Sequence, residues 1–120
     1  MAKRILILDD DQQILDVVSF LLIDSGYDVQ TLDSGEQIFS IIEQFHPDLV
    51  LMDVMLANMD GRVICKDLKE FEGTNGIPII LISGTHDLAE SLHQIGAPND
   101  FLSKPFDIDV LLSKIIDQLK

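Results

Sequence analysis

The chain has 120 residues, of which 47% are hydrophobic, so it is long enough to bury a core and too apolar to be disordered. Its formal net charge is −13, from 21 acidic and 8 basic side chains, which argues against a surface for nucleic acid or for an anionic membrane. We expect a single domain over residues 1–120.

The sequence lacks the usual marks of export and membrane insertion. Cys65 is the one cysteine, so an intrachain disulfide is excluded. The first apolar run, residues 5–8, is too short for the core of a signal peptide, and three aspartates follow it. No stretch approaches the ~20 apolar residues that span a membrane. We therefore expect a cytoplasmic protein.

The first quarter of the chain predicts a strand, a helix and a second strand. Residues 5–8 have the length and composition of a strand that is buried on both faces. Helical spacing follows from residue 12 to residue 25, with Asp11 as a candidate N-cap and Gly26 as the stop. Residues 27–32 alternate between apolar and polar, which is typical of a half-exposed edge strand. The apolar positions of the helix are Ile14, Val17, Val18, Leu21 and Leu22.

The middle of the chain contains the most informative strand. Ile38, Ile41, Ile42 and Phe45 predict a second helix, which must end before Pro47. Residues 48–52 then form another strand, in which residues 49–52 are all apolar and which ends abruptly at Asp53. A loop over residues 53–61 follows that strand.

Three further segments have apolar residues at helical spacing, and two strands separate them. Ile64, Leu68 and Phe71 predict the inner face of a third helix. Residues 77–82 form a buried strand with Pro78 near its beginning, because a central strand cannot use a residue without an N–H. The remaining predicted elements are a short fourth helix through residues 88, 92 and 95, a brief strand at 100–103 and a final helix that runs to Lys120. The apolar positions of the final helix are Ile108, Leu111, Leu112, Ile115 and Leu119.

Five strands that alternate with five helices predict a parallel sheet with right-handed crossovers and helices on both faces. The polar strand comes second in the chain, and the flavodoxin-like order 2-1-3-4-5 places it at an edge. In that order, ligands bind between the first and third strands, so Asp9, Asp10 and Asp53 would face one crevice. The predicted fold class is α/β, a single flavodoxin-like doubly wound (βα)5 domain.

The residues at the strand ends predict a phosphoryl site. Two unit charges ~4 Å apart repel by about 4 kcal/mol at an effective dielectric of 20, so three carboxylates favour a bound cation. Oxygen ligands with room for water suit Mg²⁺. Lys104 follows the fifth strand and Ser83 ends the fourth, which adds an ammonium and a hydroxyl. A Gly-rich nucleotide cradle is absent from the sequence. This set favours a carboxylate that forms an aspartyl phosphate.

Four segments, in this order and each at a strand end, resemble the response-regulator receiver domain of two-component signalling over essentially the whole chain. They are residues 5–11, 53–61, 82–84 and 104–106. The resemblance implies that Asp53 takes a phosphoryl group from a histidine kinase or a histidine phosphotransfer protein. It also implies a regulatory domain that assists its own phosphorylation and dephosphorylation and is not an independent enzyme.

The resemblance further implies the ligands of the metal. Asp10 and Asp53 would bind Mg²⁺ directly, Asp9 mostly through water, and Met55 through its backbone carbonyl. Lys104 would pair with the phosphoryl oxygens.

Ser83 and Phe101 are implied as the residues that report phosphorylation. Ser83 would hydrogen-bond the phosphoryl group and pull its loop inward, and Phe101 would turn inward as the loop moves. The altered surface would consist of the fourth helix, the fifth strand and the last helix, and a homodimer through it is a further expectation. The chain departs from the usual family pattern at Ala57, at Gly84 and at Phe101, which lacks the hydroxyl of the more common tyrosine.

Three alternatives remain open. Asp9 and Asp10 would also suit a solvated helix cap, and Asp53 a turn. A Mg²⁺-dependent phosphatase with an aspartyl-phosphate intermediate usually carries a second carboxylate two residues after the nucleophile, where this chain has Met55. The third alternative is an inert adaptor that binds no Mg²⁺.

Overall fold

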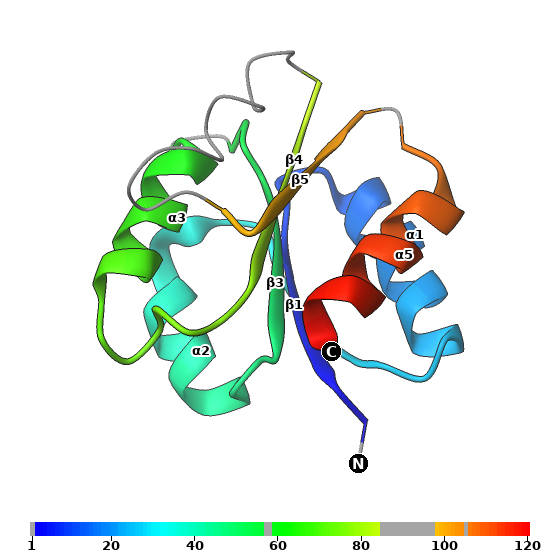
Figure 1. Ribbon diagram of the computed structural model, residues 1–120. Coiled ribbons are helices and arrows are strands. Elements are labelled where there is room, and N and C mark those ends of the chain that lie inside the picture. The colour runs from blue at the N-terminus through cyan, green and yellow to red at the C-terminus, as the bar shows by residue number, and fades with distance from the viewer. Residues whose placement is uncertain (1, 57–58, 85–97, 105) are drawn as a thin grey trace.

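The computed structural model describes residues 2–56, 59–84, 98–104 and 106–120 (Figure 1). The strands are β1 (Arg4–Leu8), β2 (Asp28–Leu32), β3 (Leu49–Asp53), β4 (Ile79–Ser83) and β5 (Asp100–Ser103). The helices are α1 (Gln12–Asp24), the short 3₁₀ turn η1 (Gly35–Gln37), α2 (Ile38–Phe45), α3 (Gly61–Glu70) and α5 (Ile108–Leu119). The predicted fourth helix falls on residues that lie outside the described ranges.

The strands form one parallel sheet in the order β2-β1-β3-β4-β5, which confirms the predicted topology and places the polar strand at an edge. In Figure 1, α2 and α3 cover one face of the sheet, and α1 and α5 cover the other. Leu8 pairs with Met52 and Asp53 pairs with Ile82, so the strands end at a common edge. This edge carries the residues predicted to be functional.

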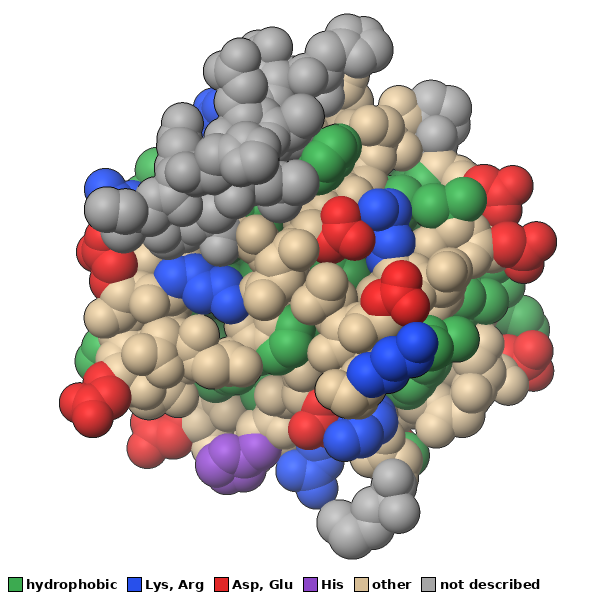
Figure 2. Space-filling model, viewed as in Figure 1, with side chains coloured by type: hydrophobic (Ala, Val, Ile, Leu, Met, Phe, Trp, Pro, Cys, Tyr) green, Lys and Arg blue, Asp and Glu red, His purple; other side chains and the backbone are tan. Residues whose placement is uncertain are grey.

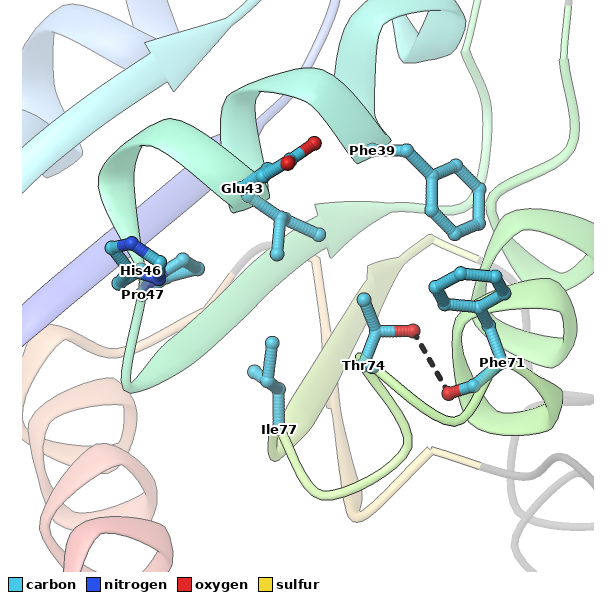
Figure 3. A pocket seen from close by; sticks show the side chains of 9 residues that line it. Phe39, Glu43, His46, Pro47, Phe71, Thr74 and Ile77 are labelled. Atoms are coloured by element: carbon cyan, nitrogen blue, oxygen red, sulfur yellow. Dashed lines mark hydrogen bonds between the residues drawn. The ribbon is translucent and has the colours of Figure 1, made fainter.

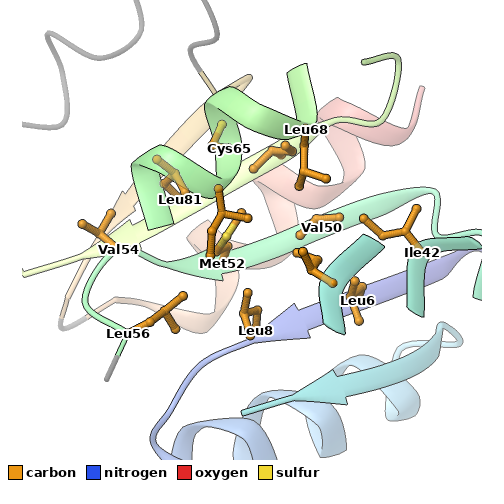
Figure 4. Packing of buried hydrophobic residues seen from close by; sticks show 13 residues of the cluster. Leu6, Leu8, Ile42, Val50, Met52, Val54, Leu56, Cys65, Leu68 and Leu81 are labelled. Carbon is orange, nitrogen blue, oxygen red and sulfur yellow. The ribbon is translucent and has the colours of Figure 1, made fainter. Parts of the chain in front are cut away.

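The core consists of two apolar clusters, one on each face of the sheet. Alternate residues of β3 enter opposite clusters: Val50 and Met52 face α2 and α3, whereas Leu49 and Leu51 face α1 and α5. This is why a strand buried on both faces appears as a continuous apolar run in the sequence. Figure 4 shows the cluster beneath α2 and α3, which includes Leu6, Leu8, Val50, Met52 and Leu81 from strands and Ile42, Cys65 and Leu68 from helices.

The ends of α1 follow the sequence signals. The Asp11 carboxylate accepts a hydrogen bond from the Gln13 backbone N–H at 3.0 Å, which confirms the predicted N-cap. Gly26 follows the helix with a φ of 97°, a left-handed conformation that glycine adopts without strain. The helices predicted from apolar residues before Pro47 and at the end of the chain are also observed, as α2 and α5.

Two predicted helix faces are wrong in part. The buried side of α1 consists of Leu15, Val18 and Leu22, while Val17 is 57% exposed. Phe71 was expected on the inner face of the third helix, but α3 ends at Glu70 and Phe71 is 56% exposed.

The strand β4 begins at Ile79, after Pro78, so the proline does not interrupt the hydrogen-bond ladder of the sheet.

Within the described part of the chain, no helix has both the length and the apolar character needed to cross a membrane.

Candidate functional site

Three carboxylates converge at the carboxyl ends of β1 and β3. Asp9 and Asp10 follow β1, and Asp53 is the last residue of β3, the strand next to it. One oxygen from each carboxylate lies within 4.8 Å of the others. Asp9 is 2% exposed and Asp53 5% exposed, whereas Asp10 is open to solvent. The structure therefore brings together the three aspartates that the sequence predicted at one crevice.

Backbone amides and Lys104 orient the two buried carboxylates. Oδ1 of Asp9 accepts the backbone N–H of Asp11 at 2.9 Å, and Oδ1 of Asp53 accepts that of Met55 at 3.2 Å. The remaining oxygen of each faces Lys104, whose Nζ lies 3.1 Å from Asp53 Oδ2 and 3.5 Å from Asp9 Oδ2. One ammonium thus bridges the carboxylates of two adjacent strands.

The electrostatics of the crevice reflect burial and crowding. Burial raises the pKa of the Asp9 carboxyl, and the nearby Asp53 charge raises it further, against the lowering effect of the Asp11 N–H and of Lys104. Burial alone would lower the pKa of the Lys104 ammonium, but its hydrogen bonds and charge interactions with Asp53 and Asp9 outweigh burial and raise it. The carboxylates therefore favour a cation, and Lys104 supplies part of that charge.

In the absence of divalent metal, Asp9→Asn should stabilise the fold at pH 7. When folding raises the pKa of a carboxyl, the folded state loses stability as the pH rises through the folded-state pKa. The amide in Asp9→Asn does not ionise, so the variant avoids this loss. We expect a gain on the order of 1 kcal/mol, or roughly 4 °C in the melting temperature. The gain should disappear as the pH falls below the usual aspartate pKa, where Asp9 is protonated in both states. Thermal unfolding in EDTA across this pH range would measure it, and a lower melting temperature at pH 7 would contradict the argument.

The carboxylates fit a hard divalent cation. Mg²⁺ prefers oxygen ligands and retains several waters, and this cluster offers one or more oxygens from each of three aspartates, one of them solvent-exposed. Asp9, Asp10 and Asp53 are the residues that would hold it. The predicted participation of the Met55 carbonyl stays a prediction.

Ser83 lies at the carboxyl end of β4, whereas Phe101 lies two residues before the end of the neighbouring strand β5. Ser83 is the last residue of β4 and is fully buried, and its carbonyl accepts the backbone N–H of Lys104 at 2.8 Å. Phe101 is half-buried in β5, packs against the cluster beneath α2 and α3, and has Lys114 Nζ 5.9 Å from its ring centroid. Their switch roles stay predictions.

Gly61 ends the loop predicted over residues 53–61, and no individual role was predicted for it. A Cβ at this position would lie 2.2 Å from the backbone oxygen of Asp53. The Gly61 N–H donates to the Val54 carbonyl at 2.8 Å. The start of α3 therefore packs directly on the backbone that carries Asp53, a tertiary contact without a local sequence signal.

Comparison with known proteins identifies relatives over most of the chain. The family model for the response regulator receiver domain matches residues 5–116. The DNA-binding dual master transcriptional regulator RpaA of Synechocystis sp. is 35% identical over 113 residues, which cover 93% of this chain and 47% of that protein. The DNA-binding response regulator MtrA of Mycobacterium tuberculosis is 28% identical over 121 residues, which cover 100% of this chain and 52% of that protein. The chain thus spans about half the length of the curated relatives it matches.

Solved structures agree with the fold. A putative response regulator from Chloroflexus aurantiacus superimposes with a TM-score of 0.89 at 28% identity, over 99% of this chain and 98% of that one. The receiver domain of a signal transduction histidine kinase from Syntrophus aciditrophicus gives a TM-score of 0.88 at 29% identity, over 98% of this chain and 90% of that one.

Proposed function

The chain belongs to the response-regulator receiver family, a family of regulatory signalling domains, and from that premise we propose that residues 1–120 are a phosphoacceptor domain. Asp53 takes the phosphoryl group from a phosphohistidine on a histidine kinase or a phosphotransfer protein. The observation that supports this most is the position of Asp53, at the end of a central strand, with Lys104 Nζ at 3.1 Å and two further aspartates beside it.

The proposed chemistry is one displacement at phosphorus. A carboxylate oxygen of Asp53 forms the new O–P bond while the P–N bond to the histidine breaks. When bound, Mg²⁺ would supply positive charge that stabilises the transferring phosphoryl group. Lys104 already donates to Asp53 Oδ2, and its ammonium would follow the charge onto a phosphoryl oxygen. Asp9, Asp10 and Asp53 would hold the cation.

Phosphorylation by a small-molecule donor tests this proposal without knowledge of the natural kinase. Incubation of the chain with acetyl phosphate and Mg²⁺ should add one phosphoryl group, measured by intact-protein mass spectrometry. An excess of EDTA should reduce the rate by roughly tenfold or more, because the cation offsets the repulsion between the donor and the acidic crevice. Equal labelling with and without EDTA would contradict the role of the metal.

Lys104→Met should separate metal binding from phosphoryl transfer. The ammonium repels a divalent cation in the same crevice, so its removal should raise the Mg²⁺ affinity by roughly threefold or more. Phosphoryl uptake should nevertheless fall, because the transferring oxygens lose an ion-pair partner. Isothermal titration with MgCl₂ and the acetyl phosphate assay measure the two effects. Weaker Mg²⁺ binding together with unchanged uptake would place Lys104 outside the proposed mechanism.

We propose that Ser83 and Phe101 transmit the phosphorylated state. Ser83 would hydrogen-bond the phosphoryl group, and the half-buried Phe101 ring would move with the Ser83 loop toward the core that it already contacts. The output surface would include β5, α5 and the predicted fourth helix, whose residues lie outside the described ranges. A homodimer through this surface stays a prediction.

The partners of any longer protein are a separate question. RpaA and MtrA are named as DNA-binding, and this chain covers about half of each. We propose that residues 1–120 do not themselves contact nucleic acid, since their formal net charge is −13. On the face shown in Figure 2, Lys and Arg side chains are interspersed with Asp and Glu and do not form a continuous basic area. A cytoplasmic location likewise stays a prediction.

The phosphatase alternative has less support. Met55 occupies the position where a general-acid carboxylate would be needed, and its side chain is 68% exposed. Turnover of a phosphate ester by the isolated chain, at more than one product per protein, would favour this alternative.

A further inference from the structure

A groove of about 570 Å³ lies far from the carboxylates, between α2 and the loop that joins α3 to β4. Pro47, which precedes β3, and Ile77, which precedes β4, both line it. The groove is therefore at the amino ends of the strands, whereas the carboxylates are at the carboxyl ends. The five residues of β3 separate the two edges by ~13 Å. The groove is distinct from the proposed phosphoryl site.

Aromatic and aliphatic side chains form most of the groove. The rings of Phe39 and Phe71 meet edge to face with centroids 5.5 Å apart, and these residues are 42% and 56% exposed. Figure 3 shows this pair at one end of the groove, His46 and Pro47 toward the other, and Ile77 between them. A volume of this size with an apolar, aromatic lining is typical of sites for small organic ligands.

The polar groups of the groove favour a positively charged ligand. The Thr74 hydroxyl lies 2.6 Å from the backbone carbonyl oxygen of Leu68 and 3.3 Å from that of Phe71. Its proton is therefore donated within the protein and not to a ligand. In the described part of the chain, the side chains of Glu43 and His46 form no hydrogen bond or ion pair. No described Lys or Arg lines the groove. Glu43 thus contributes an exposed carboxylate to the lining, and no described Lys or Arg side chain of the groove compensates its charge.

We propose that this groove binds a small organic cation, namely an aryl- or branched-alkyl-ammonium compound. Its apolar part would lie against Phe39, Phe71 and Ile77, where burial from water provides the main driving force. Its ammonium would donate to Glu43 and lie close to the ring faces, which attract cations. Anionic compounds are disfavoured by Glu43 and by the net charge of −13.

Three probes of similar size and different charge test the proposal. The ¹⁵N-labelled full chain is titrated by NMR with 2-phenylethylammonium, 2-phenylethanol and 3-phenylpropionate. We expect amide shifts at Phe39, Glu43, Phe71 and Thr74, with dissociation constants in the millimolar range. The ammonium compound should bind about threefold more tightly than the alcohol, as expected for a solvent-exposed ion pair, and the carboxylate should bind most weakly.

Two variants and a matched control identify the source of the selectivity. Glu43→Gln should abolish the preference for the ammonium compound, whereas Asp24→Asn, which removes an exposed carboxylate at the end of α1 on the other face of the sheet, should keep it. Phe71→Ala should weaken all three probes about fivefold, through lost apolar contact. The proposal is overturned if groove amides do not shift, if the carboxylate binds as well as the ammonium compound, or if Glu43→Gln keeps the preference. Groove shifts that depend on protein concentration without a probe would identify a second copy of the chain as the occupant and would also overturn it.

Discussion

Asp53→Asn is expected to abolish phosphoryl uptake from acetyl phosphate. The amide has nearly the shape of the carboxylate and can still accept the Met55 N–H, which lies 3.2 Å from Oδ1, but it lacks the anionic oxygen that attacks phosphorus. The rate of labelling should fall by ~100-fold or more, because the nucleophile itself is lost. Intact-protein mass spectrometry in the presence of Mg²⁺ measures the result directly.

Asp28→Asn provides the matched control for this experiment. Asp28 is an exposed aspartate at the amino end of β2, at the opposite edge of the sheet from the crevice. Its amide variant should be labelled at the wild-type rate. Full stoichiometric labelling of Asp53→Asn would disprove the assignment. Thermal unfolding should show that the variant is folded, because the substitution removes one of two nearly buried charges that repel each other.

The position of Asp53 is predictable from the sequence because one physical rule governs it. A parallel strand covered on both faces must be apolar, so an abrupt carboxylate marks the end of that strand. Asp53 is the last residue of β3, and Asp9 and Asp10 follow β1 in the same way. The strand order then determines that these ends are adjacent. For this reason both the topology and the convergence of the aspartates could be inferred without coordinates.

Helix faces were less predictable where apolar residues surround the helix. In α1, Val17, Val18, Leu22 and Ile23 are all apolar, yet Val18 and Leu22 are buried while Val17 and Ile23 are exposed. Periodicity does not distinguish two overlapping apolar stripes, because the choice depends on which one meets the sheet. In α2 and α5 the predicted apolar positions include every buried residue of the helix, namely Ile38 and Ile42 in α2, and Leu111 and Ile115 in α5.

Contacts between segments that fold back on each other were not predictable at all. Phe71 continues the spacing of α3, but the chain leaves the helix at this residue, and its ring turns to Phe39 on α2. The groove beside this pair arises from that arrangement. Gly61 is a similar case, because its importance depends on how closely α3 approaches the end of β3.

Gly61→Ala is expected to disturb both the fold and the site. The new Cβ would lie 2.2 Å from the Asp53 carbonyl oxygen and 3.0 Å from the Val54 Cα. These backbone atoms lie at the buried end of a central strand and have little freedom to move. In a helix without this contact, alanine in place of glycine would stabilise by about 1 kcal/mol. We expect the clash to outweigh this gain and to lower the free energy of unfolding by about 1–3 kcal/mol, measured by urea denaturation.

The same substitution should reduce phosphoryl uptake in the folded protein. A backbone shift at Asp53 also moves its carboxylate relative to Lys104, now 3.1 Å away, and misplacement of a nucleophile on this scale costs roughly tenfold or more in rate. Uptake should be assayed at a temperature at which the variant remains folded. Gly76→Ala is the matched control, since a Cβ there meets no atom within 4 Å and should change stability by no more than about 0.5 kcal/mol. If Gly61→Ala were destabilised yet phosphorylated at the wild-type rate, Gly61 would serve packing alone. If Gly61→Ala matched Gly76→Ala in both measurements, the end of β3 would tolerate the shift. The close approach of α3 would then not be needed to position Asp53.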